Sequence, residues 1–115
     1  MRGVRRRRIA GRTPTTGQRR GRLPAALSPD AATELVHRVE RGGTVAWSRR
    51  GLEHAQAQEM TTVECDHALR DGVADPPELE RGQWRYRIHC QRMCVVVIFR
   101  SDDEAVVVDA WRKQR

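Results

Sequence analysis

Two sets of side chains alternate along residues 83–90. The apolar set is Trp84, Tyr86, Ile88 and Cys90, and the basic set, the basic stripe from here on, is Arg85, Arg87 and His89. Successive side chains of a β-strand point to opposite faces of the sheet. The alternation therefore predicts a strand with one apolar face and one basic face, and it raises the question of what the basic stripe faces.

Two further strands follow. Residues 93–99 (MCVVVIF) are apolar on both faces, as in a central strand; residues 101–104 (SDDE) predict a turn, and residues 105–112 (AVVVDAWR) predict a last strand. With a loop at Gln91-Arg92, the expected cross-strand rows are Arg87–Val96–Asp109, His89–Cys94–Trp111 and Arg85–Ile98–Val107. The expected core face carries Trp84, Tyr86, Ile88, Val95, Val97, Phe99, Val106 and Val108. A slip of one residue would exchange the two faces of a whole strand.

Capping signals predict three helices before the strands. Ser28 and Pro29 begin the first, which Gly42-Gly43 ends; Ser48 caps a second that runs to about Glu59; Thr61 and Glu64 have the spacing of a capping box for a third, over 63–71, which Gly72 ends. Residues 73–82 (VADPPELERG) predict a loop or an edge strand because of their two prolines. The expected fold class is α+β, with two to three helices packed on one face of an antiparallel sheet of three to four strands.

The net charge of +7 is distributed unevenly along the 115 residues. Residues 1–22 hold nine arginines and no acid, which leaves 13 basic and 15 acidic groups, a net charge of −2, for the rest of the chain. Such a segment has too few apolar side chains to offset its ordering entropy. We expect residues 1–23 to form a disordered arm that binds nucleic acid non-specifically, and residues 24–115 to form one domain. The alternatives for the arm are a merely solvated segment, an extension from an upstream start codon, or a transit peptide.

Cellular location is indicated by what the chain lacks. It has no run of about 18 apolar residues and no apolar block after its first basic residues, so we expect a cytoplasmic protein without a membrane partner. Its three cysteines, Cys65, Cys90 and Cys94, are an odd number, which favours reduced thiols.

Three segments carry a resemblance to a known family. These are SRRGLEHAQAQEMTTVECDHALRDG, QWRYRI and MCVVVIFRSDDEAVVVDAWR, within residues 44–112, and the positions that fit are Ser48, Leu69, Gly72, Arg85, Tyr86, Val95, Val96, Trp111 and Arg112. They resemble a bacterial domain-of-unknown-function family of the RelE-like toxin superfamily and, in outline, the MqsR-type mRNA interferases. Arg50 stands where that family's pattern has a histidine leading the helix, and Asp109 where it has a threonine. The resemblance implies a RelE-like fold and an mRNA endoribonuclease, the toxin of a toxin–antitoxin pair, which needs no cofactor or metal.

The candidate site follows from the chemistry that such an enzyme needs. When the 2′-hydroxyl of RNA is the nucleophile, the protein supplies acid/base groups and cations. Histidine titrates near neutral pH, and arginine binds phosphate oxygens with two donors. The predicted catalytic residues are His89, Arg87, Arg85 and Arg112; the predicted RNA-binding residues are Trp111, Arg100 and Arg92. The expected partners are RNA or the ribosome, and an antitoxin that covers the basic face.

Other interpretations stay open. The stripe also fits a solvated outer face. The protein also fits a non-catalytic RNA- or protein-binding module of the same fold, which the replacements at Arg50 and Asp109 favour. His54 is a second acid/base candidate if its helix points it toward the sheet. A metal site at Cys65, His67, Cys90 and Cys94 lacks a common ligand spacing, and a nucleophilic pair of Cys94 and His89 lacks a third, orienting group.

Overall fold

The computed structural model describes residues 25–113. The predicted arm, residues 1–23, lies outside that range. Three helices begin at the predicted caps: α1 (Pro29–Gly42), α2 (Arg49–Ala57) and α3 (Thr62–Asp71). The hydroxyls of Ser28 and Ser48 accept backbone N–H bonds of 3.1 and 2.9 Å, and Thr61 and Glu64 form the expected capping box. The helix starts were predictable because a cap acts within one turn. Helix α2 ends at Ala57, two residues before the predicted end.

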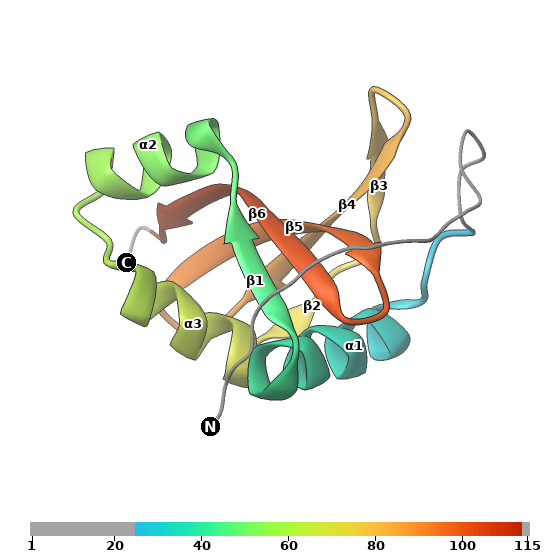
Figure 1. The fold of residues 1–115 in the computed structure, drawn as a ribbon. Coiled ribbons are helices and arrows are strands. Elements are labelled where there is room, and N and C mark those ends of the chain that lie inside the picture. Colours follow the sequence, from blue (N-terminus) through green and yellow to red (C-terminus); the bar gives the residue numbers. More distant parts are fainter. Residues whose placement is uncertain (1–24, 114–115) are drawn as a thin grey trace.

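The sheet has six strands rather than the three or four predicted, and it is mixed rather than antiparallel. The strands are β1 (Thr44–Trp47), β2 (Val73–Ala74), β3 (Glu78–Glu80), β4 (Gln83–His89), β5 (Met93–Ser101) and β6 (Glu104–Arg112). Their order is β1-β6-β5-β4-β2, and β3 also pairs with β4. The added strand β1 is the apolar segment between the first two helices, and it lies parallel to β6 (Figure 1). The segment 73–82 forms the edge strands β2 and β3, one of its two predicted states.

Two of the three helices cover one face of the sheet. Helices α1 and α3 lie together below it in Figure 1, and α2 lies apart from them, at the other end of β1. The core between the sheet and the helices contains Val36, Val39, Leu69, Ile88, Val95 and Val97, all fully buried. Helix α2 packs against β6, where the Ser48 N–H donates to the Val107 carbonyl at 3.0 Å. The prediction of helices on one face therefore holds for α1 and α3.

The register of the last two strands contains a bulge that the sequence did not reveal. The rows Arg87–Val96–Asp109 and His89–Cys94–Trp111 are confirmed, but Val97 pairs with Val107 and Ile98 with Val106, not with Val107. Val108 is thus an extra residue on β6, and a bulge of this kind changes the face of the residues on one side of it. As a correction, Val106 and Val108 lie on the face opposite α1 and α3, with Cys94, Val96 and Ile98, whereas Val107 points into the core.

Among residues 25–113, no helix is both long and apolar enough to cross a membrane.

Candidate active site

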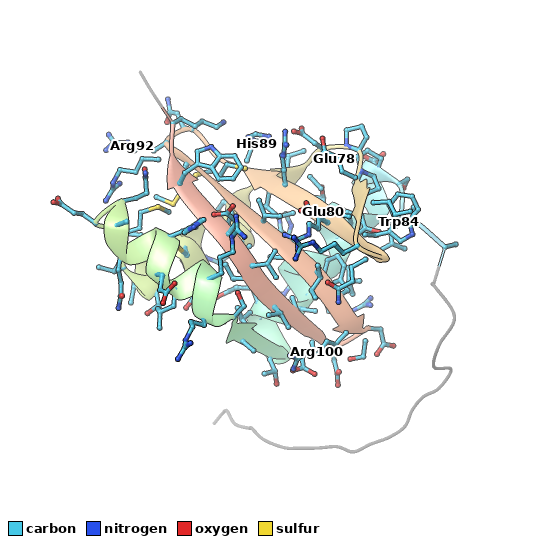
Figure 2. All side chains as sticks on the ribbon, turned by 90° about the horizontal axis from the view of Figure 1, so that it is seen from above. Glu78, Glu80, Trp84, His89, Arg92 and Arg100 are labelled. Atoms are coloured by element: carbon cyan, nitrogen blue, oxygen red, sulfur yellow. The ribbon has the colours of Figure 1, made fainter. Side chains whose placement is uncertain are left out.

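The basic stripe faces acidic side chains. Each of its members contacts one carboxylate of the edge segment before β4: Arg85 and Arg87 form ion pairs with Glu80 (3.5 Å) and Glu78 (3.2 Å), and His89 forms a hydrogen bond with Asp75 (2.5 Å). The labelled side chains of Glu78, Glu80 and His89 lie along this edge in Figure 2. The positive charge of the stripe is therefore largely balanced within the fold.

A second histidine lies on the same face, at the opposite side of the sheet. The Nδ1–H of His54 in α2 donates to Oδ1 of Asp109 in β6 at 2.5 Å. Asp109 also accepts the N–H of Ala110 at 2.8 Å, which fixes its carboxylate. Asp109 and Arg87 are both paired with Val96, so their backbones lie two strand spacings apart, about 10 Å.

The position of α2 explains how His54 reaches Asp109. A Cβ atom at Gly51 would lie 2.4 Å from the Val107 carbonyl oxygen, so only glycine permits this close approach of helix and strand. His54 is about one turn further along the helix, and Asp109 is two residues further along β6. The bulge at Val108 turns the side chain of Asp109 to the face of the sheet where His54 lies. Bulges that redirect a side chain in this way are common beside functional sites.

The two histidines use different ring nitrogens. In the His54 pair (His54 and Asp109) the carboxylate binds Nδ1, so in the neutral imidazole the proton is on Nδ1 and Nε2 carries the lone pair. Nε2 of His54 has no partner among residues 25–113 and is not buried. In the His89 pair (His89 and Asp75) the carboxylate binds Nε2, and Nδ1 is buried without a partner. Of these two histidines, only His54 presents a free ring nitrogen to a substrate.

A cation lies one helical turn from His54. Arg50 precedes it by four residues on α2, a spacing that places both side chains on one face of the helix. Arg50 is exposed and forms no ion pair within residues 25–113. The site thus combines an oriented histidine with an unpaired guanidinium.

Arg112, a predicted catalytic residue, lies on the other face. It pairs with Met93, a core residue, and its guanidinium donates to the carbonyls of Gln58 (3.0 Å) and Glu59 (2.8 Å) and pairs with Glu64 at 3.2 Å. These bonds hold the junction between α2 and α3. Glu64 in turn has a lowered pKa, because it accepts the Thr61 N–H and lies beside Arg112.

The predicted RNA-binding residues are spread over the molecule. Trp111 is half-buried on the face of the stripe, in the row of His89. Arg92 and Arg100 lie at opposite ends of β5 (Figure 2), about 27 Å of strand apart. Arg100 pairs with Glu104 at 3.1 Å and borders a cavity of about 520 Å³ that Trp84 and Phe99 also line. These three residues do not form one patch.

Two of the three cysteines, Cys65 and Cys94, are buried, and Cys94 lies opposite His89 on the neighbouring strand. Burial raises the pKa of the Cys65 thiol to about 11 and that of Cys94 to about 12. Within the described part of the chain, no group of three or more His, Cys, Asp or Glu side chains is placed to hold a metal ion.

Comparisons with models of protein families, with curated proteins and with solved structures find no match to this chain. The resemblance to the RelE-like superfamily stays a prediction.

Proposed function

We propose that this protein is an endoribonuclease that uses the 2′-hydroxyl of RNA as nucleophile, without a metal ion, and that His54 is its acid/base residue. The observation that carries the proposal is the His54 pair: Asp109 binds Nδ1 and leaves Nε2 without a partner among residues 25–113, one helical turn from Arg50. A carboxylate on one ring nitrogen fixes the orientation of the other, which is how histidine bases are prepared for proton transfer.

The chemistry follows from these groups. Nε2 of His54 takes the proton of the 2′-hydroxyl, whose oxygen attacks the adjacent phosphorus; the bond to the 5′-oxygen breaks, and that oxygen takes a proton from water. Asp109 stabilises the imidazolium that forms. Arg50 binds the phosphate oxygens while their charge increases, the role for which a guanidinium is suited. A cyclic 2′,3′-phosphate is the expected product.

In this proposal the stripe binds RNA and does not take part in the chemical step. The pairs of Arg85 and Arg87 with Glu80 and Glu78 involve carboxylates that are more than half exposed. Ion pairs of this kind contribute little stability, so a phosphate can replace the carboxylate. Arg85 and Arg87 are then positioned to bind the RNA backbone beyond the cleaved bond. The roles predicted for His89 and Arg112 remain predictions.

The toxin assignment rests on the resemblance in sequence. An RNA-cleaving toxin is toxic until a partner protein covers its active site. If this protein is such a toxin, its antitoxin covers the face of the sheet that carries His54 and the stripe.

A non-catalytic binding module is the second candidate. The observation that favours it is the balanced charge of the stripe, because a face of paired charges fits a protein surface better than a polyanion. This module would bind RNA or a protein through the same face without cutting RNA.

The test is cleavage of a defined mRNA by the purified protein in the presence of a metal chelator, alone and on ribosomes, together with growth arrest in a bacterial host. We expect His54→Gln to lower the cleavage rate about 10²-fold or more. The matched control is His67→Gln, the same change at an exposed histidine of α3, with an expected rate within about twofold of wild type.

Two outcomes decide otherwise. If His89→Gln loses activity and His54→Gln keeps it, the acid/base residue is the one predicted from the stripe. If the wild-type protein binds RNA or a protein through this face but cuts no RNA, the binding module is correct. Thermal unfolding of each variant separates lost chemistry from lost structure.

A further inference from the structure

Strand β1 leaves one edge of the sheet open. The N–H groups of Thr44 and Ser48 donate toward β6: Thr44 to the carbonyl of Asp103, which directly precedes that strand (2.9 Å), and Ser48 to the carbonyl of Val107 (3.0 Å). Alternate residues of a parallel strand bond the same neighbour, so the backbone groups of Val45 and Trp47 point away from β6. No strand within residues 25–113 pairs with this side of β1. An unpaired row of this kind is a template for another strand.

A groove runs beside the open edge, on the side of α1 and α3. This β1 groove has a volume of about 420 Å³ and is lined by Glu40, Gly43, Val45, Trp47, Thr62 and Asp66. Val45 and Trp47 are half-buried, and they form its apolar wall. A strand added to β1 would place every second side chain into this groove.

The groove is acidic. Glu40 and Asp66 are half-buried, and neither forms an ion pair within the described part of the chain. Burial and then the charge of Glu40 raise the pKa of Asp66, and together they outweigh the opposite effect of His67 and Arg70. A cationic side chain between them would remove this repulsion.

The opposite side of β1 is apolar. Ala46 packs there against the cluster that contains Val106, which is 3% exposed. A strand that pairs with β1 therefore meets carboxylates on one face and apolar side chains on the other. This is the pattern of a segment that alternates basic and apolar residues.

We propose that the β1 groove is the docking site of an extended, basic segment of a protein partner, which adds a strand to β1 and places a lysine or arginine between Glu40 and Asp66. In strand addition, main-chain hydrogen bonds supply affinity and pockets for alternate side chains supply specificity. The proposal does not rest on RNA cleavage, because an acidic groove repels RNA.

The charge also argues against a second copy as the occupant. A symmetric dimer that pairs β1 with β1 brings the same patch of both copies together. Glu40 and Asp66 of the two copies would then lie close to one another, and like charges at an interface are unfavourable. A basic partner is favoured for the same reason.

The experiment uses the full chain and a labelled eight-residue peptide in which lysine and valine alternate. Fluorescence anisotropy should show saturable binding, and a peptide in which glutamate and valine alternate should not bind. We expect Glu40→Gln with Asp66→Asn to weaken binding at least about tenfold. The matched control, Glu34→Gln with Glu53→Gln, changes the net charge equally at exposed sites and should stay within about twofold.

The strand addition is tested by its hydrogen bonds. Val45→Pro removes an outward N–H and no bond to β6, a position where edge strands tolerate proline, and should weaken binding about tenfold. A Lys-Val peptide with N-methyl groups on alternate residues tests the same bonds on the wild-type protein, and it should not bind. Sedimentation should show a monomer.

Three results would overturn the proposal. The first is no saturable binding of the Lys-Val peptide up to about 1 mM. The second is equal binding by the Glu40/Asp66 variant or by the N-methylated peptide. The third is a wild-type dimer that Val45→Pro dissociates, which would make a second copy the occupant.

Discussion

Two histidine–aspartate pairs lie on one face of this sheet, and they differ in what they leave free. The His54 pair and the His89 pair have the same separation, 2.5 Å, and both aspartates are accessible in part. In the first, Asp109 binds Nδ1 and Nε2 faces solvent; in the second, Asp75 binds Nε2 and Nδ1 is buried. The partner of a histidine is therefore a weaker guide to function than the exposure of its other nitrogen.

The surroundings of the two pairs agree with this difference. The His54 pair joins a helix to the sheet, and an unpaired arginine lies one helical turn away. The His89 pair instead attaches the edge segment to β4. The N–H of Asp75 strengthens this attachment, because it donates to the Arg87 carbonyl at 3.0 Å. The first arrangement suits proton transfer, and the second suits the attachment of a loop.

The largest stability effect is expected at Ile88, and it tests whether both pairs lie outside the core. Ile88 is fully buried and paired with Val95, while its neighbour Arg87 is about half exposed. Ile88→Ala should cost on the order of 2–5 kcal/mol of the free energy of unfolding, and Arg87→Ala roughly 0.5 kcal/mol. Urea unfolding measures both. The reverse order would mean that the stripe is buried, and neither histidine would then be available.

The next prediction separates the two pairs by activity. Asp109→Asn replaces an acceptor that fixes the proton on Nδ1, so the rate of RNA cleavage should fall about 10²-fold, equivalent to about 2.7 kcal/mol of activation free energy. Asp75→Asn makes the same change in the His89 pair and should lower the rate less than about threefold. Equal losses would remove the distinction between the pairs.

These residues show which parts of the sheet and of the site were predictable from the sequence. It placed Arg87 and Asp109 in one row correctly, because the basic residues of the stripe alternate with aromatic and aliphatic residues. It also placed the helix caps correctly, because they are local signals. The sequence could not show which face of the sheet Val106, Val107 and Val108 each point to, because three valines in succession do not alternate between apolar and polar. It left His54 as one of two alternatives, since its contact with Asp109 spans 55 residues and depends on Gly51. The spacing of Arg50 and His54, four residues apart on one face of a predicted helix, was the available signal.

A smaller effect should distinguish the pairs by stability. His89→Ala removes the bond to Asp75 from a ring that is 31% exposed, and we expect a loss of about 1 kcal/mol. His54→Ala should cost roughly 0.5 kcal/mol or less, because its ring is 42% exposed. The two histidines would thus have opposite rankings in stability and in activity. If His54→Ala is the more destabilising, its pair is structural as well, and the activity assays must be repeated at matched stability.

The smallest effect concerns the reactivity of Cys94. This residue lies on β5 opposite His89, and with His89 it forms the nucleophilic pair that the sequence left as an alternative. Cys94 is fully buried, and burial raises its pKa to about 12; the pKa of Cys65 is raised to about 11 for the same reason. A raised pKa lowers the thiolate fraction, to roughly 10⁻⁴ for Cys94 at pH 8, and the thiolate is the reactive form. Iodoacetamide at that pH should therefore modify the half-buried Cys90 first, then Cys65 and last Cys94, as followed by mass spectrometry. Unfolding in denaturant should make the three rates similar, which controls for sequence effects. Fast modification of Cys94 in the folded protein would instead show a reactive thiol beside His89, and the His89 pair would have to be considered as the catalytic one.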